Sequence, residues 1–538
     1  MRNAMLQAVA QGVMLQWGWR RAVLAILAGA LSSLAMPPFG LFPVLFLTFP
    51  VFVWLIDGSV ASGPNKRRQE LLSSAAVGWC FGFGYFLAGL WWVGGAFLVD
   101  AKTFGWLMPF AVMLMPAGLA LFHALGAAAA RALWRPGPLR VFAFAAGLAA
   151  AEILRGYALT GFPWNAFGYA LAQTTVTLQL GALVGLHGMT AIAAFVFAAP
   201  AAFGLQDAAN ARGRLLVPAL AVLILALGSA YGAYRLSIPE PPATAKRIRV
   251  VQPSIPQQQK FDSAKASETL SALLTLSDVA TSPQSSGFAD FDAVIWPESA
   301  FPFFLQDEPA AAAALAALIP DGKVLISGLQ RYETDASHPR GYRGYNSIGV
   351  IDTSANLVAA YDKTHLVPFG EYLPLQDLLE AIGFRQLTNM PGGFDAGSAR
   401  APLSVPGLPA FLPLICYEAI FPGVADRALP RAVWLLNVTN DAWYGDTPGP
   451  RQHLLQARLR AVEEGLPMVR AANNGISAVI DSRGRILASL PLDERNVIDA
   501  VLPGALPPPP FTRLGVIPAL VLVMLFFAGA LVWRQAGR

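Results

Sequence analysis

The sequence contains few charged residues and few cysteines, and each shortage excludes a class of protein. Only 13% of the 538 residues are charged, whereas 55% are hydrophobic. A soluble globular chain typically carries about 25% charged residues, so this composition indicates a membrane protein. The two cysteines, Cys80 and Cys416, lie in an apolar run and in a polar region respectively. Because these segments have different solvents, we predict that no disulfide joins them.

Signatures of metal, nucleotide and nucleic-acid binding are also missing. The five histidines contain no His-x-x-x-His pair, and there is no Cys-x-x-Cys pair, so we predict neither a metal nor another cofactor. No glycine-rich turn precedes a lysine in the way that a phosphate-binding loop requires. The net charge is +5. The basic residues of the chain lie in short clusters between apolar runs, which argues against nucleic acid as a partner.

Apolar runs long enough to cross a membrane fill residues 1–236 and recur near the C-terminus. A helix needs about 20 apolar residues to span the hydrocarbon core. The first run continues into the second without a convincing cleavage pattern, so we expect it to be retained rather than removed as a signal peptide. We predict about eight transmembrane helices, at residues 21–37, 39–57, 76–99, 105–130, 139–157, 176–204, 215–234 and 514–533.

Positive charge alternates between the two sides of these spans. With a cytoplasmic N-terminus, the short loops on the opposite side hold little more than Lys102 and Arg155. Cytoplasmic loops are enriched in Lys and Arg, so we expect both termini in the cytoplasm and a multi-pass protein of the bacterial inner membrane. The chain then divides into a membrane domain at 1–236, a periplasmic domain at 237–512, and a last span with its tail at 513–538.

The polar region 237–512 alternates between strand-like and helix-like segments. Its β-rich runs lie at 247–252, 293–296, 323–329, 348–352, 411–415, 433–438, 468–471 and 476–480. Helical stretches are expected at 264–280, 309–317 and 451–464. This alternation predicts an α/β layered domain. Proline-rich segments at 238–242 and 507–510 flank it as stiff connectors.

Three strand ends in this region concentrate reactive side chains. Their sequences are WPES at 296–299, YDKTH at 361–365 continuing to FGEY at 369–372, and LICYE at 414–418. A thiol, a carboxylate and an ammonium are the parts of a covalent acyl-transfer site, where a base takes the thiol proton and a cation stabilises the oxyanion. An isolated cysteine is more often a buried apolar residue, and we keep that interpretation for Cys80.

In this order, the three segments resemble the carbon-nitrogen hydrolase, or nitrilase, superfamily, which implies an αββα sandwich. Together with eight spans, a GFPW segment ending at Trp164 and an NDAWYG segment beginning at Asn440, they resemble the apolipoprotein N-acyltransferase family over essentially the whole chain. The resemblance implies that Glu298 is the general base, Lys363 the oxyanion-stabilising cation and Cys416 the nucleophile.

The resemblance also implies supporting residues, a reaction and partners. The residues that support the site or contact substrate are Glu371, Tyr417, Glu418, Trp443, Trp164 and Asn440. Phe261 stands where the family usually has Trp, so an indole N–H is missing. The implied reaction moves the sn-1 acyl chain of a phospholipid, such as phosphatidylethanolamine, through a Cys416 thioester to the N-terminal amine of a diacylglyceryl apolipoprotein.

Two other functions remain open from the sequence. A membrane-tethered amidase or nitrilase with the same three residues would hydrolyse a small soluble substrate without lipid. A transporter or lipid-binding scaffold would not need Cys416. Against that alternative, we expect almost no buried charge in the predicted spans apart from Glu152. The apolar segments 301–305 and 373–384 are interpreted either as core or as lids that face the bilayer.

Overall fold

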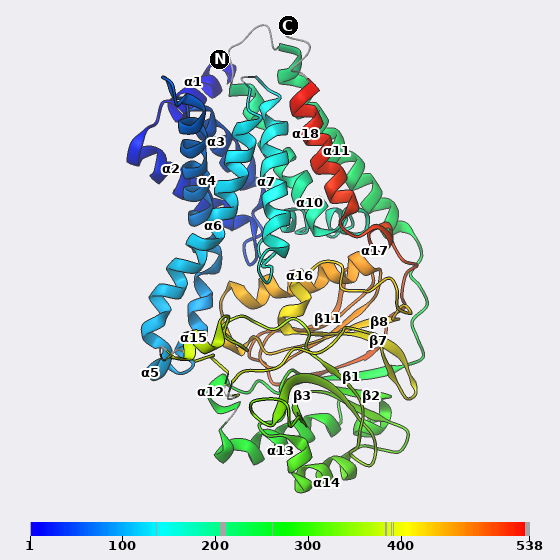
Figure 1. Cartoon of the computed structure of the whole chain (residues 1–538). Coiled ribbons are helices and arrows are strands. Elements are labelled where there is room, and N and C mark those ends of the chain that lie inside the picture. Colours follow the sequence, from blue (N-terminus) through cyan, green and yellow to red (C-terminus); the bar gives the residue numbers. More distant parts are fainter. Residues whose placement is uncertain are drawn as a thin grey trace. The chain divides into compact units, whose positions relative to one another are not determined.

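The computed structural model describes residues 2–135, 137–204, 211–260, 262–381, 383, 385–388, 390 and 392–532. The chain divides into two compact units (Figure 1). The helical unit contains Met1–Gly94, Leu107–Ile238 and Arg513–Arg538. The sandwich unit contains Pro239–Thr512 and, in addition, Gly95–Trp106, which covers the end of the predicted span 76–99 and the start of the predicted span 105–130.

The helical unit packs through very small residues. Its helices are α1 (Arg2–Met14), α2 (Gly18–Ser32), α3 (Leu45–Asp57), α4 (Lys66–Leu90), α6 (Met108–Ala132), α7 (Arg140–Tyr157), α8 (Gly168–Leu171), α9 (Thr175–Leu178), α10 (Gly181–Ala198), α11 (Ala211–Ser237) and α18 (Ile517–Val532). A Cβ at Gly84 of α4 would lie 2.0 Å from the carbonyl oxygen of Ile26 in α2. One at Gly147 of α7 would lie 2.4 Å from the carbonyl oxygen of Gly126 in α6. Such close backbone contacts are typical of helices that pack in lipid.

Four of the predicted spans are confirmed as helical segments long and apolar enough to cross a membrane. Within the described residues these segments are Lys66–Leu98, Ala101–Ala132, Gly181–Gly204 and Gly213–Ser237. The predicted spans at 21–37, 39–57 and 514–533 coincide with helices of 13 to 16 residues, α2, α3 and α18; the last predicted residue, 533, lies outside the described residues. The span at 139–157 coincides with α7, which has 18 residues and includes three charged side chains.

Buried charge in the helical unit exceeds the sequence-based expectation, which recognised only Glu152. Arg155, assigned to a loop, lies in α7 and is 1% exposed. Its Nε and Nη2 donate to the two carboxylate oxygens of Glu152 over 2.8 and 2.7 Å. Asp57 of α3 likewise pairs with Arg140 at 2.8 Å. A buried carboxylate requires a cation or several donors nearby, so the expectation of almost no buried charge apart from Glu152 was wrong.

Two six-stranded sheets form the sandwich unit. The first consists of β1 (Arg247–Gln252), β2 (Ala293–Trp296), β3 (Val324–Thr334), β4 (Tyr342–Ile351), β5 (Leu357–Asp362) and β12 (Asn496–Val501). The second consists of β6 (Leu403–Val405), β7 (Leu408–Ile415), β8 (Trp434–Thr439), β9 (Met468–Ala472), β10 (Ser477–Ile480) and β11 (Ile486–Leu490). Their strand orders are β12-β1-β2-β3-β4-β5 and β11-β10-β9-β8-β7-β6. Each sheet contains three neighbouring parallel strands, β1, β2 and β3 in the first and β7, β8 and β9 in the second. The other neighbouring strands pair antiparallel, as β3 with β4 and β9 with β10.

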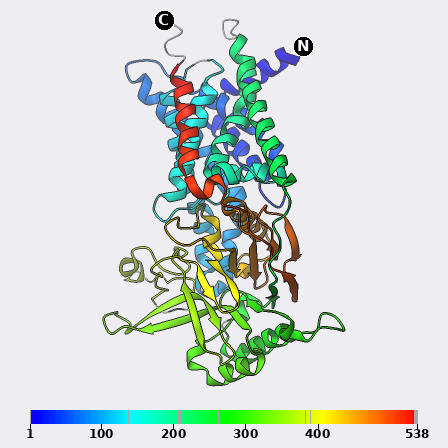
Figure 2. The same cartoon turned by 90° about the vertical axis from the view of Figure 1, so that its right-hand side faces the viewer.

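The two sheets stack into the expected αββα sandwich (Figures 1 and 2). The helices of this unit are α5 (Ala101–Phe104), α12 (Gln257–Lys260), α13 (Ala266–Asp278), α14 (Pro309–Leu318), α15 (Gln376–Ala381) and α16 (Pro448–Glu464), and α17 (Pro510–Leu514) leads out of it. Because strand side chains alternate between faces, Ile295 and Leu436 meet in the core between the sheets. Val294 instead packs in the outer cluster with α13 and α14, and Leu435 in the cluster with α16.

All eight predicted strand segments are confirmed, and the four further strands found among the described residues occupy the sheet edges. The edge strands are β12 and β5 in the first sheet and β11 and β6 in the second. Central strands are buried on both faces and read as continuous apolar runs. The edge strands carry many exposed residues, as in β11 and β12, so they lack that signal.

Candidate active site

Glu298, Lys363 and Cys416 each follow the end of a strand, and all three are buried. Glu298 follows β2, Lys363 follows β5, and Cys416 follows β7 as the first residue of the short 3-10 helix η10 (Cys416–Ile420). Their exposed fractions are 7%, 1% and 7%. Cys416 and Ser299, the residue after Glu298, both have a φ of +47°. Side chains other than glycine rarely adopt this left-handed backbone, and such strain concentrates at functional sites.

Glu298, Lys363 and Glu371 form one hydrogen-bonded cluster. Lys363 Nζ lies 2.9 Å from Glu371 Oε2 and 3.8 Å from Glu298 Oε1. Asn346 Nδ2, on β4, donates to Glu298 and to Glu371, each over 2.8 Å. The structure therefore brings together three of the predicted residues and adds Asn346, which sequence reasoning missed because a lone asparagine in a strand carries no spacing signal.

Charges around Lys363 and Cys416 act on the pKa values of both groups. Burial alone would lower the pKa of Lys363, but Glu371, Glu298 and Cys416 outweigh it and raise this pKa above its usual range. Burial raises the pKa of the Cys416 thiol well above its ordinary value, Glu298 raises it further, and Lys363 opposes the shift. At neutral pH, Lys363 is a cation and Cys416 is a thiol, so a base must take the thiol proton before sulfur can attack.

Glu418 has a different role from Glu371, because it joins two of the strand ends. Its Oε2 accepts from the backbone N–H of Ile415, over 2.8 Å. Its Oε1 accepts from the backbone N–H of Thr364 over 3.0 Å and from Arg400 Nη2 over 2.7 Å. Burial would raise the pKa of Glu418, but Arg400 and the Ile415 N–H lower it. The carboxylate thus fixes the turn at Cys416 to the segment that carries Lys363.

Lys260, at the end of α12, is a second buried lysine at this site. Its Nζ donates to the backbone carbonyl oxygen of Glu298 over 2.7 Å, and the residue is 2% exposed. Burial lowers the pKa of Lys260 to about 8, against the opposing effects of Glu298 and Cys416. The neighbouring Phe261, which stands where the family usually has Trp, lies outside the described residues.

The remaining predicted residues occupy varied positions. Asn440 is 3% exposed; its Nδ2 donates to Gln257 of α12 over 2.7 Å and its Oδ1 accepts from Asn473 over 3.1 Å. Tyr417 is 6% exposed, and its ring centroid lies 5.1 Å from that of Phe421. Half-buried Trp443 ends the 3-10 helix η11 (Asp441–Trp443).

Trp164 belongs to the helical unit. It is 2% exposed, and its ring centroid lies 5.0 Å from that of Trp92. Its backbone carbonyl oxygen accepts from Arg155 Nη1 over 3.0 Å. The same guanidinium binds the Glu152 carboxylate, so the GFPW segment is attached to the buried charges of α7.

The two apolar segments considered as lids differ in exposure. Phe301 is 1% exposed and packs against Trp296 in the outer core of the first sheet. It is therefore a core residue. Leu375 and Leu378, near and within α15, are 76% and 60% exposed. The exposed apolar side chains thus belong to the second segment.

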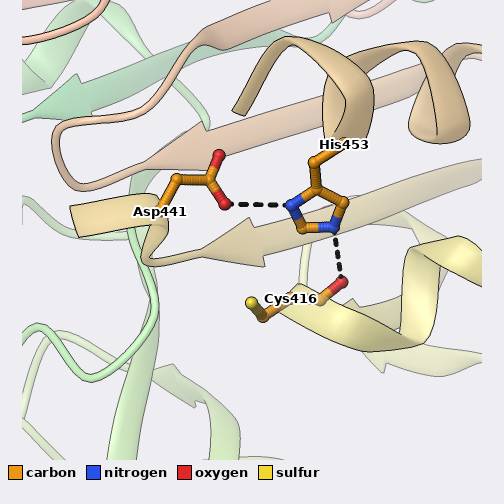
Figure 3. Close-up of side chains that lie close together, drawn as sticks. All are labelled: Cys416, Asp441 and His453. Atoms are coloured by element: carbon orange, nitrogen blue, oxygen red, sulfur yellow. Dashed lines mark hydrogen bonds and ion pairs between the residues drawn. The ribbon is translucent and has the colours of Figure 1, made fainter. Parts of the chain in front are cut away.

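Cys416 also has a histidine and an aspartate close by, as Figure 3 shows. Ligand atoms of Cys416, Asp441 and His453 lie within 4.8 Å of one another. However, His453 Nδ1 lies 2.9 Å from Asp441 Oδ1, and Nε2 lies 3.0 Å from the Cys416 carbonyl oxygen. Arg470 Nη2 donates to Asp441 Oδ2 over 2.7 Å. With both ring nitrogens engaged and a guanidinium beside the carboxylate, these residues do not fit a metal ion.

Family models match both parts of the chain. The model described as "Apolipoprotein N-acyltransferase N-terminal domain" matches residues 28–199, and that described as "Carbon-nitrogen hydrolase" matches residues 247–505. The second match contains Glu298, Lys363 and Cys416. Among solved structures, an amidase from Nesterenkonia sp. AN1 aligns with a TM-score of 0.33 and 18% identity, over 48% of this chain and 93% of that chain.

Curated relatives match nearly the whole length. The apolipoprotein N-acyltransferase of Rhodopseudomonas palustris is 50% identical over 525 residues, which cover 97% of this chain and 97% of that protein. The apolipoprotein N-acyltransferase of Bradyrhizobium diazoefficiens is 51% identical over 537 residues, which cover 99% and 98%. This chain therefore belongs to the apolipoprotein N-acyltransferase family.

Proposed function

We propose that this protein moves a fatty acyl chain from a phospholipid to the N-terminal amine of a diacylglyceryl apolipoprotein through a thioester on Cys416. One observation carries the proposal: the pKa of a buried thiol on a strained turn is raised by the Glu298 carboxylate and lowered by the Lys363 ammonium, so both charges act on the thiol. Membership of the family supplies the substrates. The acyl donor is a membrane phospholipid, with phosphatidylethanolamine as the first candidate.

In the first half-reaction, Glu298 takes the proton from Cys416 Sγ as sulfur attacks the sn-1 ester carbonyl of the phospholipid. The Lys363 ammonium stabilises the oxyanion that forms. The ester C–O bond then breaks, and Glu298 returns its proton to the departing glycerol oxygen. The products are lysophospholipid and an acyl-thioester on Cys416.

In the second half-reaction, the neutral α-amine of the lipoprotein cysteine attacks the thioester carbonyl. Glu298 takes a proton from the attacking nitrogen, and the same ammonium stabilises the second oxyanion. The C–S bond breaks, the thiolate regains the proton from Glu298, and an amide remains on the lipoprotein. Donor and acceptor thus use one site in turn, which is ping-pong chemistry.

The distances within the cluster support Glu298 rather than Glu371 as the base. Glu371 is close to Lys363, at 2.9 Å, and also accepts from the Val367 N–H over 2.8 Å. Glu298 lies 3.8 Å from Lys363 and raises the pKa of the Cys416 thiol more than any other carboxylate does. Glu371 accordingly holds Lys363 in place, and Glu298 handles the proton.

We further propose that residues 1–236 and 513–538 form a membrane domain of about eight helices in the inner membrane, with both termini cytoplasmic and the 237–512 domain periplasmic. The clusters of Lys and Arg support this orientation. Both substrates carry acyl chains in the bilayer. Removing a sixteen-carbon chain from lipid would cost on the order of 10 kcal/mol, at about 0.8 kcal/mol per methylene, so an enzyme attached to the membrane avoids that cost.

Intact-mass measurement of the purified full chain tests the reaction. After incubation with phosphatidylethanolamine in detergent, the wild type should gain the mass of one acyl chain, and hydroxylamine should remove it. Cys416→Ser should gain no hydroxylamine-labile acyl mass. Cys80→Ser is the matched control, because this second cysteine lies in α4 of the helical unit, and it should acylate like the wild type.

Two outcomes would overturn the proposal. One is a hydroxylamine-labile adduct on Cys416→Ser, which would place the thioester elsewhere. The other is an unmodified wild type that hydrolyses a soluble amide without lipid, which would indicate a membrane-tethered amidase.

A further inference from the structure

His453 lies close to the nucleophile but binds its main chain. This residue is on α16, and its Nε2 lies 3.0 Å from the carbonyl oxygen of Cys416. Figure 3 shows that oxygen directed at the imidazole, with the sulfur on the other side of the residue. A Cys-His-Asp set of this kind invites comparison with cysteine proteases, so the hydrogen bonds must decide its role.

The hydrogen bonds exclude His453 as the base. A carbonyl oxygen only accepts, so Nε2 must carry a proton whether the ring is neutral or charged. Burial and the neighbouring Arg470 lower the pKa of His453, against the opposing effects of Asp441 and the Cys416 carbonyl. A general base needs an unprotonated atom within about 3.2 Å of the proton it removes. Nε2 already carries a proton and therefore cannot act as the base, and Nδ1 faces Asp441 and Arg470.

Holding the Cys416 carbonyl also fixes the next N–H. The carbonyl of Cys416 and the N–H of Tyr417 belong to one planar trans peptide, so the direction of one sets the direction of the other. This peptide follows a left-handed residue, φ +47° at Cys416, a conformation that persists only when its surroundings hold it. The bond from His453 is such a restraint.

The imidazole is itself firmly held. Asp441 Oδ1 accepts from Thr439 Oγ1 over 3.0 Å, and Oδ2 accepts from Arg470 Nη2 over 2.7 Å. Arg470 also donates to the backbone carbonyl of Ile476 over 3.2 Å. Thr439 and Arg470 lie on the central strands β8 and β9, so the network rests on the rigid part of the second sheet.

We propose that His453 is a positioning residue, which holds the Cys416–Tyr417 peptide so that the Tyr417 N–H joins Lys363 in stabilising the oxyanion. The inference rests on the proposed acyl transfer at Cys416. It assigns Asp441 and Arg470 the task of orienting the imidazole. The bond from His453 affects oxyanion stabilisation, whereas the reactivity of the thiol depends on Glu298 and Lys363.

The test compares His453→Leu with His453→Gln in the full chain. Leucine has a similar volume and no donor, whereas the glutamine amide can donate to the same carbonyl. The first measurement is the single-turnover rate of acyl-enzyme formation from phosphatidylethanolamine. A misplacement of about 1 Å can cost about 100-fold, so we expect a loss of that order in His453→Leu and recovery to within about tenfold of wild type in His453→Gln.

The second measurement is alkylation of Cys416 by iodoacetamide as a function of pH. This reaction forms no oxyanion, so the His453→Leu variant should keep the wild-type rate and midpoint. Three outcomes would overturn the proposal: acyl-enzyme formation in His453→Leu within about threefold of wild type, a shifted alkylation midpoint, or no recovery in a His453→Gln protein that melts like wild type. If the wild type itself forms no acyl-enzyme, the proposed function fails first.

Discussion

The two sides of Cys416 contain similar groups and differ in how far those groups are already hydrogen-bonded. The thiol has Glu298 and Lys363 as charged neighbours, and these two lie 3.8 Å apart. The carbonyl has His453, whose other nitrogen contacts Asp441, and that carboxylate also binds Arg470. Proximity of an acid and a base to a cysteine therefore does not define catalysis. What matters is which atoms remain able to exchange a proton.

Removing the base on the thiol side should have the largest effect. Glu298→Gln keeps the size and one acceptor but cannot take a proton. General-base catalysis contributes about 10²–10⁴-fold, so acyl-enzyme formation should fall by about 10³-fold, measured by single-turnover mass analysis. A loss of less than tenfold would show that another group takes the proton. Glu268→Gln, an exposed acid on α13, is the matched control and should leave the rate unchanged.

A change on the carbonyl side should act on stability and on its pH dependence. Burial would raise the pKa of Asp441, but Arg470 and His453 lower it to about 2. Because the folded pKa lies below the unfolded value of about 3.9, this carboxylate stabilises the fold above about pH 4 and loses that effect as pH falls toward 2.

Asp441→Asn should therefore destabilise the protein by about 3 kcal/mol near neutral pH, because it leaves a buried Arg470 without its anion. The difference in melting temperature from wild type should shrink between about pH 4 and pH 2. A difference that stays constant across this range would contradict the assignment. The measurement is thermal unfolding in detergent followed by intrinsic fluorescence.

A smaller effect is expected from Glu371, which separates holding a cation from exchanging a proton. Hydrogen bonds to charged groups are worth about 1.5–3 kcal/mol, and Glu371→Gln keeps an acceptor for Lys363 while removing the charge. We expect acyl-enzyme formation to slow by about tenfold, with the apparent KM for phospholipid unchanged. A loss as large as that of Glu298→Gln would reverse the assignment of the two acids.

The smallest predicted effect concerns Lys260, which holds the Glu298 carbonyl much as His453 holds that of Cys416. The pKa of Lys260 is lowered to about 8, so its positive charge is lost as pH rises through that value. Acyl-enzyme formation should decline by a few fold above pH 8 in the wild type. In Lys260→Met this step should be absent from the pH profile, and its persistence would point to another group.

Much of the fold and of the candidate site could be predicted from the sequence. The remaining features could not be predicted, for identifiable physical reasons. Central strands and the segments around Glu298, Lys363 and Cys416 have strong local patterns. Edge strands do not, because they are partly exposed. Lys260 and His453 were missed since each binds a main-chain carbonyl in a segment distant in sequence. Such a contact forms only in the folded chain, and because its acceptor is a main-chain carbonyl, it leaves no pattern of side chains in the sequence.

The composition of the sandwich unit has a consequence for how the protein is made. Gly95–Trp106 belongs to this unit, although it is synthesised well before Pro239–Thr512. A Cβ at Gly95 would lie 3.3 Å from the carbonyl oxygen of Trp443, so the early segment is packed against a segment that is synthesised much later. The sandwich unit is therefore complete only after Trp443 has been synthesised. A polypeptide that begins at Pro239 would lack this piece, and the sandwich unit is therefore not a contiguous module that can simply be cut from the gene.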